Sequence, residues 1–186
     1  MRRIADDFIS SRGAPDILVA NLGSGKARAS DALSPDEWRQ FFEINVYSAL
    51  NVMSAFLPAM REKRSGAIVL ISSIAGIERT RAPLGYAAAK SSLLTLVKNM
   101  SVELAEHGIR INAVVPGNIF FKGGRWEEIL STHPEVKANY IEKEVPMKRF
   151  GTPEEVAAAV TFLAAPISSF TTGTYLIVDG GETKRC

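Results

Sequence analysis

Short apolar runs alternate with long helical patterns along the chain, and this alternation constrains the fold more than any other feature. Each run is short and almost continuously apolar, which is typical of a strand covered on both faces of a sheet. Strands that are separated by helices form βαβ units. The sequence therefore predicts an α/β fold with a parallel sheet of about four strands, at residues 16–21, 67–71, 109–115 and 174–178.

Capping signals mark where two of the intervening helices begin. Ser34 and Glu37 form a capping box around Pro35, and Thr152 and Glu155 repeat the pattern. Two further segments are rich in helix-forming residues and are each followed by a glycine that can end a helix. We expect helices at 4–12, 35–62, 86–107 and 153–164.

Composition narrows the class of protein. The 186 residues are 46% apolar and 23% charged, which predicts a single globular domain over residues 1–186. The net charge of +2 gives no electrostatic reason to expect nucleic acid or an anionic membrane as a partner. The single cysteine excludes an intrachain disulfide, no apolar run is long enough to span a bilayer, and no signal peptide is visible. We expect a cytoplasmic protein with no membrane partner.

Tyr86 and Lys90 are the first candidate catalytic residues. They are four positions apart near the start of a helix, so they share one face. A lysine cation beside a tyrosine favours the phenolate and lowers the pKa of the phenol, which would make Tyr86 a general acid or base for hydroxyl–carbonyl interconversion. The same spacing also occurs on solvated helices, so the pair alone does not decide.

Ser73 and Asn45 add to this pair. Ser73 follows a buried strand, and ligands bind outside the carboxyl ends of parallel strands. Its hydroxyl could hold a substrate oxygen, or Ser72 and Ser73 could be ordinary strand-end serines. Asn45 lies inside an apolar helix, where a buried amide either braces the backbone or holds a water.

Taken together, these residues resemble the catalytic tetrad of the short-chain dehydrogenase/reductase family, with Tyr86-Ala-Ala-Ala-Lys90 as its YxxxK motif. The resemblance covers nearly the whole chain. Further matches in the same order are Ala20-Asn21-Leu22-Gly23, Pro116-Gly117, Gly151-Thr-Pro-Glu-Glu155 and Asp179-Gly180-Gly181. The resemblance implies a doubly wound, Rossmann-like sheet.

The resemblance also implies roles for these residues. Tyr86 would transfer the proton, Lys90 would lower its pKa and bind the nicotinamide ribose, and Ser73 would hold the substrate oxygen. Asn45 would position a relay water through its backbone carbonyl. The implied cofactor is NAD or NADP, which supplies the hydride. The residues implied to contact it are Asn21, Gly23, Tyr86, Lys90, Pro116, Gly117 and Ile119.

One part of the family pattern is not found. Gly23 and Gly25 form only a G-x-G, and no Gly-rich cofactor fingerprint follows an earlier strand. We therefore expect a family fold that is N-terminally truncated to about four strands. The strand at 16–21, central in the family, would then lie at an edge of the sheet with an unpaired ladder.

Residues 118–150 are too long for a plain connection and correspond to the family's variable substrate lid. Trp126, Phe120 and Phe121 could line a pocket there, while Lys122 and Arg125 could meet an acidic substrate. The alternative is that the aromatic residues pack and the charges are solvated. His107 and His133 lack metal-ligand spacing, and we expect no metal site.

Two functions of different classes follow. The first is an NAD(P)-dependent oxidoreductase that acts on a small alcohol or ketone. The second is a catalytically impaired, self-associating module, because the helices at 35–62 and 86–107 correspond to the family's main subunit interface. In either case the resemblance implies a homodimer or homotetramer. Binding of nucleic acid is disfavoured by the near-neutral charge.

Overall fold

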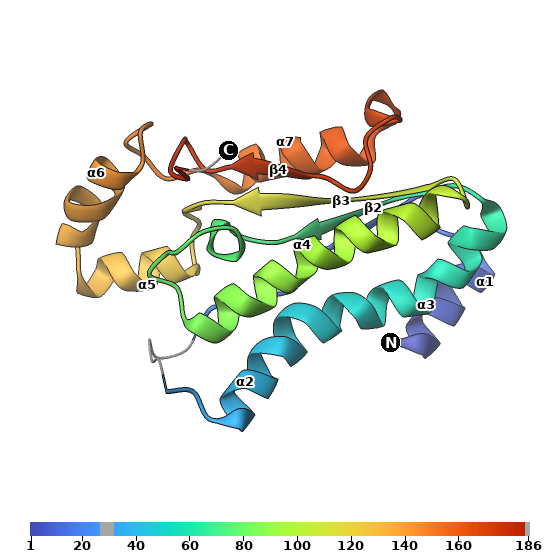
Figure 1. Ribbon diagram of the computed structural model, residues 1–186, viewed down its shortest axis with the longest axis horizontal. Helices are drawn as coiled ribbons and strands as arrows, with labels where there is room; N and C mark the ends of the chain where they lie inside the picture. The colour runs from blue at the N-terminus through green and yellow to red at the C-terminus, as the bar shows by residue number, and fades with distance from the viewer. Residues whose placement is uncertain (27–31, 185–186) are drawn as a thin grey trace.

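Four parallel strands form the centre of the protein. The structure, a computed structural model, describes residues 1–26 and 32–184. The strand order is β1-β2-β3-β4, and every neighbouring pair is parallel, which confirms the predicted sheet (Figure 1). The strands are β1 (Ile17–Ala20), β2 (Gly66–Ile71), β3 (Ile109–Pro116) and β4 (Tyr175–Val178).

The helices lie on both faces of the sheet. α3 and α4 cover one face, α7 covers the other, and α5 and α6 lie beyond the carboxyl ends of the strands (Figure 1). None of the described helices is both long and apolar enough to cross a membrane. Their bounds are α1 (Arg2–Arg12), α2 (Pro35–Phe42), α3 (Ser48–Lys63), α4 (Leu84–Ala105), α5 (Arg125–Thr132), α6 (Glu142–Glu144) and α7 (Pro153–Ala164).

Both predicted capping boxes are present. The Glu37 amide donates to Ser34 Oγ at 3.3 Å, and the Ser34 amide donates back to Glu37 Oε2 at 2.8 Å. At α7 the Glu155 amide donates to Thr152 Oγ1 at 3.4 Å, and the Thr152 amide donates to Glu155 Oε2 at 2.9 Å. These bonds satisfy amide groups that the first helical turn leaves unpaired, so each helix begins where the sequence predicts.

The helix predicted over 35–62 is interrupted. Residues Glu43–Tyr47 form a π-helical turn between α2 and α3, and Asn45 lies inside it. The spacing of apolar residues gave no sign of this turn, because an inserted π turn shifts the helix face by only part of a turn. Such turns are often found at functional sites.

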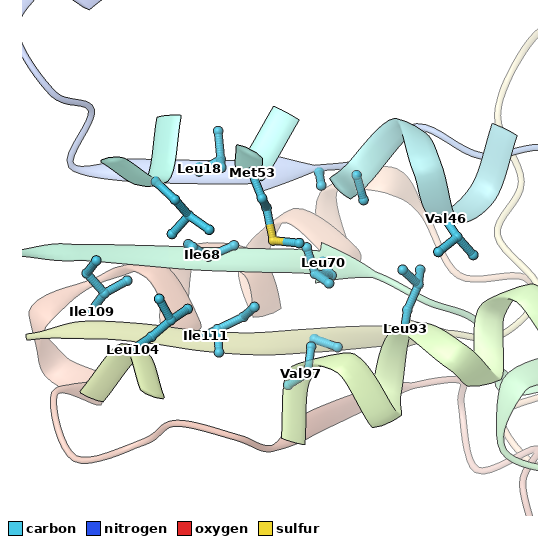
Figure 2. Packing of buried hydrophobic residues seen from close by; sticks show 14 of the residues in the cluster. Leu18, Val46, Met53, Ile68, Leu70, Leu93, Val97, Leu104, Ile109 and Ile111 are labelled. Carbon is cyan, nitrogen blue, oxygen red and sulfur yellow. The ribbon is translucent and has the colours of Figure 1, made fainter. Parts of the chain in front are cut away.

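A single large core fills the space between the sheet and α3 and α4. Met53 from α3 and Leu93 from α4 pack against Ile68 and Leu70 of β2 (Figure 2). On the opposite face, Leu163 of α7 packs in a smaller cluster with strand residues, among them Val69. The two clusters hold the sheet between fixed helices, so the carboxyl ends of the strands have defined positions.

β1 differs from its prediction. We expected both of its faces to be covered, but only Leu18 and Ala20 are buried, while Ile17 is 49% and Val19 is 42% exposed. The physical reason is that β1 lies at the edge of the sheet, and α7 packs over β2, β3 and β4. The predicted edge position of this strand is confirmed.

Candidate active site

Ser73 and Tyr86 meet where β2 ends. Ser73 follows the strand and caps a short 3₁₀ turn, Ile74–Gly76, where its Oγ accepts a hydrogen bond from the Ala75 amide at 3.2 Å. Tyr86 lies in the first turn of α4, and its phenol is close enough to the Ser73 hydroxyl for that hydroxyl to lower the pKa of Tyr86. Ser73 Oγ accepts from the Ala75 amide, and its own proton can still be donated to a neighbouring oxygen. The strand end and the helix start therefore place two hydroxyl groups side by side.

Lys90 lies one turn further along α4 and is tied to the same strand. Its side chain is only 3% exposed, and its ammonium donates to the Ile71 carbonyl at 2.8 Å. Ser72 Oγ donates to the Lys90 carbonyl at 2.8 Å, which fixes the backbone of α4 against the end of β2. The Lys90 Nζ lies 5.8 Å from the centre of the Tyr86 ring. The predicted pair thus shares one face of α4, with Lys90 buried and Tyr86 partly exposed.

Burial dominates the electrostatics of this pair. Burial raises the pKa of Tyr86, and the hydrogen bond from Ser73 offsets only part of that rise. Burial also lowers the pKa of Lys90 to about 8. Desolvation penalises the charged form of each group, and it is the largest cause of both shifts. Tyr86 is therefore a neutral phenol at neutral pH.

Asn45 braces the loop that follows β1. Its side chain is 1% exposed; Oδ1 accepts from the Ser24 amide, and Nδ2 donates to the Ser24 carbonyl, both at 3.0 Å. Nδ2 also donates to the Phe41 carbonyl at 2.9 Å. Of the two predicted alternatives, the structure shows the amide bracing the backbone. A relay water at the Asn45 carbonyl stays a prediction.

Gly23 allows this loop to approach the buried lysine. A Cβ at this position would lie 2.7 Å from Lys90 Nζ and 2.8 Å from Asn45 Oδ1, which is closer than side-chain atoms tolerate. Gly25 lies against the Tyr86 ring, at 3.5 Å from where its Cβ would be. The loop after β1 therefore packs directly on the predicted catalytic residues.

A cleft of about 730 Å³, called the larger cleft below, opens beside these residues. It lies at the carboxyl ends of β1, β2 and β3 and is closed on one side by Val156, Val160 and Thr161 of α7. Every residue predicted to contact the cofactor lines it: Asn21, Gly23, Tyr86, Lys90, Pro116, Gly117 and Ile119. The sequence motifs did not indicate the α7 wall, whose small apolar residues look like ordinary helix packing.

A smaller cleft of about 420 Å³ lies next to it. Ser73 and Tyr86 line both clefts, and so do Gly25 and Gly117. The paired hydroxyl groups therefore stand where the two clefts meet. This arrangement can bring two molecules, one in each cleft, to the same phenol oxygen.

Residues 118–150 supply part of both walls. The segment contains α5, a π turn at Lys137–Ile141 and α6. Trp126 and Arg125 line the smaller cleft, and Phe121 lines the larger one. Phe120 instead packs against Phe150, with ring centres 5.8 Å apart. A role of the segment as a substrate lid stays a prediction.

Two residues of the smaller cleft were not singled out from the sequence. Tyr140 stacks on Trp126 with ring centres 6.0 Å apart, and the guanidinium carbon of Arg81 lies 5.1 Å from the centre of the Tyr140 ring. No motif contains either residue, and only the aromatic content of the segment pointed to a pocket. In the part of the chain that the structure describes, no group of three or more His, Cys, Asp or Glu side chains is placed to hold a metal ion.

Comparison with known proteins gives consistent matches. A family model described as enoyl-(acyl carrier protein) reductase matches residues 1–183. A 3-oxoacyl-(acyl-carrier-protein) reductase of Chlamydia muridarum is 37% identical over 174 residues, which are 94% of this chain and 68% of the relative. A 7alpha-hydroxysteroid dehydrogenase of Escherichia coli K12 is 33% identical over 182 residues, 98% of this chain and 69% of the relative.

Solved structures match as closely. An oxidoreductase of the short chain dehydrogenase/reductase family from Burkholderia thailandensis has a TM-score of 0.88 and 32% identity, over 97% of this chain and 68% of the neighbour. A 7 alpha-hydroxysteroid dehydrogenase in complex with NADH and 7-oxo glycochenodeoxycholic acid has a TM-score of 0.86 and 30% identity, over 99% of this chain and 70% of the neighbour. The matched proteins are longer than the sequence described here.

Proposed function

This chain belongs to the short-chain dehydrogenase/reductase family, and from that premise we propose that it interconverts a hydroxyl and a carbonyl group on a small organic substrate with NAD(H) or NADP(H). Tyr86 is the proposed general acid and base. The proposal depends above all on one observation: Ser73 and Tyr86 line both the larger and the smaller cleft. The larger cleft is assigned to the nicotinamide end of the cofactor and the smaller to the substrate.

The larger cleft fits a flat, polar cofactor end. Gly23, Gly25 and Gly117 leave bare backbone along its wall, so a ring can approach closely. Lys90 adds a cation that, among the described residues, makes one hydrogen bond from an ammonium with three protons. The remaining protons of Lys90 are suited to the hydroxyl groups of a ribose. Bound NAD(P)H would supply the hydride for reduction.

Proton transfer is the step that this chain's own residues perform. In reduction, the substrate carbonyl carbon gains the hydride and its oxygen takes the proton of the Tyr86 phenol, which leaves a phenolate. The Ser73 hydroxyl has one proton, which it can donate either to the substrate oxygen or, after the transfer, to the phenolate. Oxidation reverses each step, with the phenolate of Tyr86 removing the proton of the substrate hydroxyl.

The protonation state of the site favours the reductive direction. The raised pKa of Tyr86 keeps the phenol protonated at neutral pH, which is the form that donates a proton. Lys90, with a pKa of about 8, is mostly protonated at the same pH and would stabilise the phenolate that forms. A buried cation next to a developing anion is an effective arrangement, because the local dielectric is low.

Asn45 is assigned a positioning role. Its amide holds the Ser24 backbone, and Gly25 on that same loop lies on the Tyr86 ring. The amide thereby fixes the loop that packs on the Tyr86 ring. Because its amide already has these partners, any contact with a relay water would come from the backbone carbonyl within the π turn.

Titration with NADH and NADPH, followed by consumption of the reduced cofactor with ketone substrates, tests the proposal. Saturable binding together with turnover is the expected result. A folded protein that shows neither would contradict an oxidoreductase and support the self-associating module. The implied homodimer or homotetramer stays a prediction; exposed apolar side chains on the relevant helices, such as Tyr47 and Val102, are consistent with it.

A further inference from the structure

We propose that the substrate carries a carboxylate group that binds Arg81, in addition to the hydroxyl or carbonyl group that meets Tyr86. The inference rests on the proposed function and extends it from a reaction to a substrate class: keto acids and hydroxy acids with an apolar or aromatic body. Arg81 would then be the residue that selects such substrates over neutral ketones.

The charges around the smaller cleft are the first observation. Two arginines, Arg81 and Arg125, are among its described lining residues, and no aspartate or glutamate is among them. The whole sequence is nearly balanced, with 22 basic and 20 acidic residues. The excess of positive charge is therefore a property of this cleft and not of the composition. A positively charged cleft attracts anionic ligands.

Arg81 and Arg125 are not equivalent. Arg125 already has a carboxylate partner, because it pairs with Glu128 Oε2 at 3.1 Å, an oxygen that also lies 3.4 Å from Lys26. Arg81 has no carboxylate partner in the described part of the chain; its guanidinium lies over the Tyr140 ring. A guanidinium stacked on a ring keeps its donors in one plane, where they can bind a carboxylate in two places at once.

The Tyr140 ring under Arg81 is firmly held. Its hydroxyl donates to Glu182 Oε1 at 2.7 Å, and Glu182 Oε2 accepts from Asn118 Nδ2 at 2.6 Å. Glu182 is 8% exposed and both of its oxygens are engaged, so it does not line the cleft and does not compete for Arg81. Burial and the contact with Glu182 raise the pKa of Tyr140 to about 12, so the ring stays neutral.

The other residues that line the smaller cleft indicate that the rest of the substrate is apolar. Trp126, Ile129 and Val136 add aromatic and aliphatic surface to the cleft. A cleft of about 420 Å³ has room for a molecule of modest size. Apolar walls, one uncompensated guanidinium and the Ser73–Tyr86 pair together fit a compound with an apolar body, a carboxylate and a reactive oxygen.

Binding can be measured without turnover, because Trp126 lies in the cleft. The other tryptophan, Trp38, lies on α2, so Trp38→Phe leaves Trp126 as the single reporter. The ligands are phenyl-substituted keto acids of increasing chain length, each paired with its methyl ester, which has the same shape but no charge. Their Kd values are compared in the Trp38→Phe background alone and with Arg81→Gln or Arg79→Gln. Arg79 is an exposed neighbour outside the cleft and serves as the matched control.

We expect at least one acid to bind about tenfold more tightly than its ester, as a charge-assisted pair would give. Arg81→Gln should abolish this preference by weakening the acid alone, and Arg79→Gln should preserve it. Equal binding of acid and ester, or a preference that survives Arg81→Gln, would overturn the proposal. Consumption of NAD(P)H is measured separately. Acid binding without turnover would contradict the proposed function but keep the anion site. Turnover of keto acids that is unaffected by Arg81→Gln would keep the proposed function but contradict the anion site.

Discussion

The two clefts beside Tyr86 are lined by different parts of the fold. The larger cleft is lined by residues at the ends of parallel strands, by glycines that follow them and by α7. The smaller cleft is lined mainly by the loop before α4 and by residues 118–150. They share the Ser73–Tyr86 pair, where the reaction is proposed to occur.

This difference separates the part of the site assigned to the cofactor from the part assigned to substrate selection. Residues at strand ends and close-packed glycines are tied to the sheet, so replacing them disturbs the fold. A wall of side chains can be replaced residue by residue while the fold is kept. Altering one cleft should therefore leave the other intact, and the following changes test that independence.

Tyr86→Phe should have the largest effect, because it removes the proposed proton donor, which lies between the two clefts. Loss of a general acid lowers turnover by about 100-fold or more. The phenyl ring keeps its contacts with Gly25, so neither cleft should change shape. The measurement is kcat with a ketone substrate together with NADPH and keto acid binding. Both binding constants should stay close to those of the unaltered protein.

Tyr175→Phe is the matched control, since Tyr175 is an exposed tyrosine on β4 that lines neither cleft. It should leave turnover unchanged. If Tyr86→Phe retained turnover comparable to this control, proton transfer would have to be assigned to another group.

Arg110→Leu should affect the larger cleft only. Arg110, on β3, donates to the carbonyls of Leu163, Ala164 and Ala165 at 2.8 to 3.2 Å and so holds the last turn of α7. Without it, several carbonyl groups lose a charged donor, and we expect the free energy of unfolding to fall by about 2 kcal/mol. Urea unfolding measures this loss.

The same variant separates the clefts, since α7 forms a wall of the larger one. NADPH should bind more weakly, whereas keto acid binding in the smaller cleft should be unchanged. Arg61→Leu, at an exposed position on α3, controls for the loss of a surface charge. Equal weakening of both ligands would show that the two clefts are coupled through the sheet.

Much of the fold was predictable because local signals and burial agree. The apolar runs predicted all four strands, and Ser34 and Thr152 predicted where their helices begin. The residues that motifs assign to the cofactor all line one cleft. These features depend on short sequence patterns, such as apolar runs, capping residues and motifs, which can be read without knowing the tertiary structure.

Other features depend on distant contacts and were missed. The π turn around Asn45 is tied to the loop at Ser24, twenty-one positions earlier in the chain. The exposed face of β1 depends on where α7 packs. The contact between the Arg81 guanidinium and the Tyr140 ring joins residues that are far apart in the sequence. Burial, which a sequence does not quantify, is the largest cause of the raised Tyr86 pKa. The predicted lowering depends on Lys90 together with a positively charged cofactor ring, and it stays a prediction.

Lys90 gives the smallest effect, and it is visible in the pH dependence of stability. Its pKa is about 8 in the folded chain, below its ordinary value of about 10.4. Between pH 8 and 10 the unfolded chain therefore binds more protons at this residue than the folded chain does. The contribution of Lys90 to the free energy of unfolding should then rise with pH, by about 1 kcal/mol for each pH unit.

Lys90→Met removes this titration while keeping an unbranched side chain. Urea unfolding of both proteins across pH 8 to 10 should show the rise only in the protein that keeps the lysine. Tyr86 does not obscure the comparison, because its pKa is raised above 10 by burial and it titrates at higher pH. A rise of equal slope in both proteins would mean that Lys90 is not the group responsible, and that the larger cleft does not hold a desolvated cation.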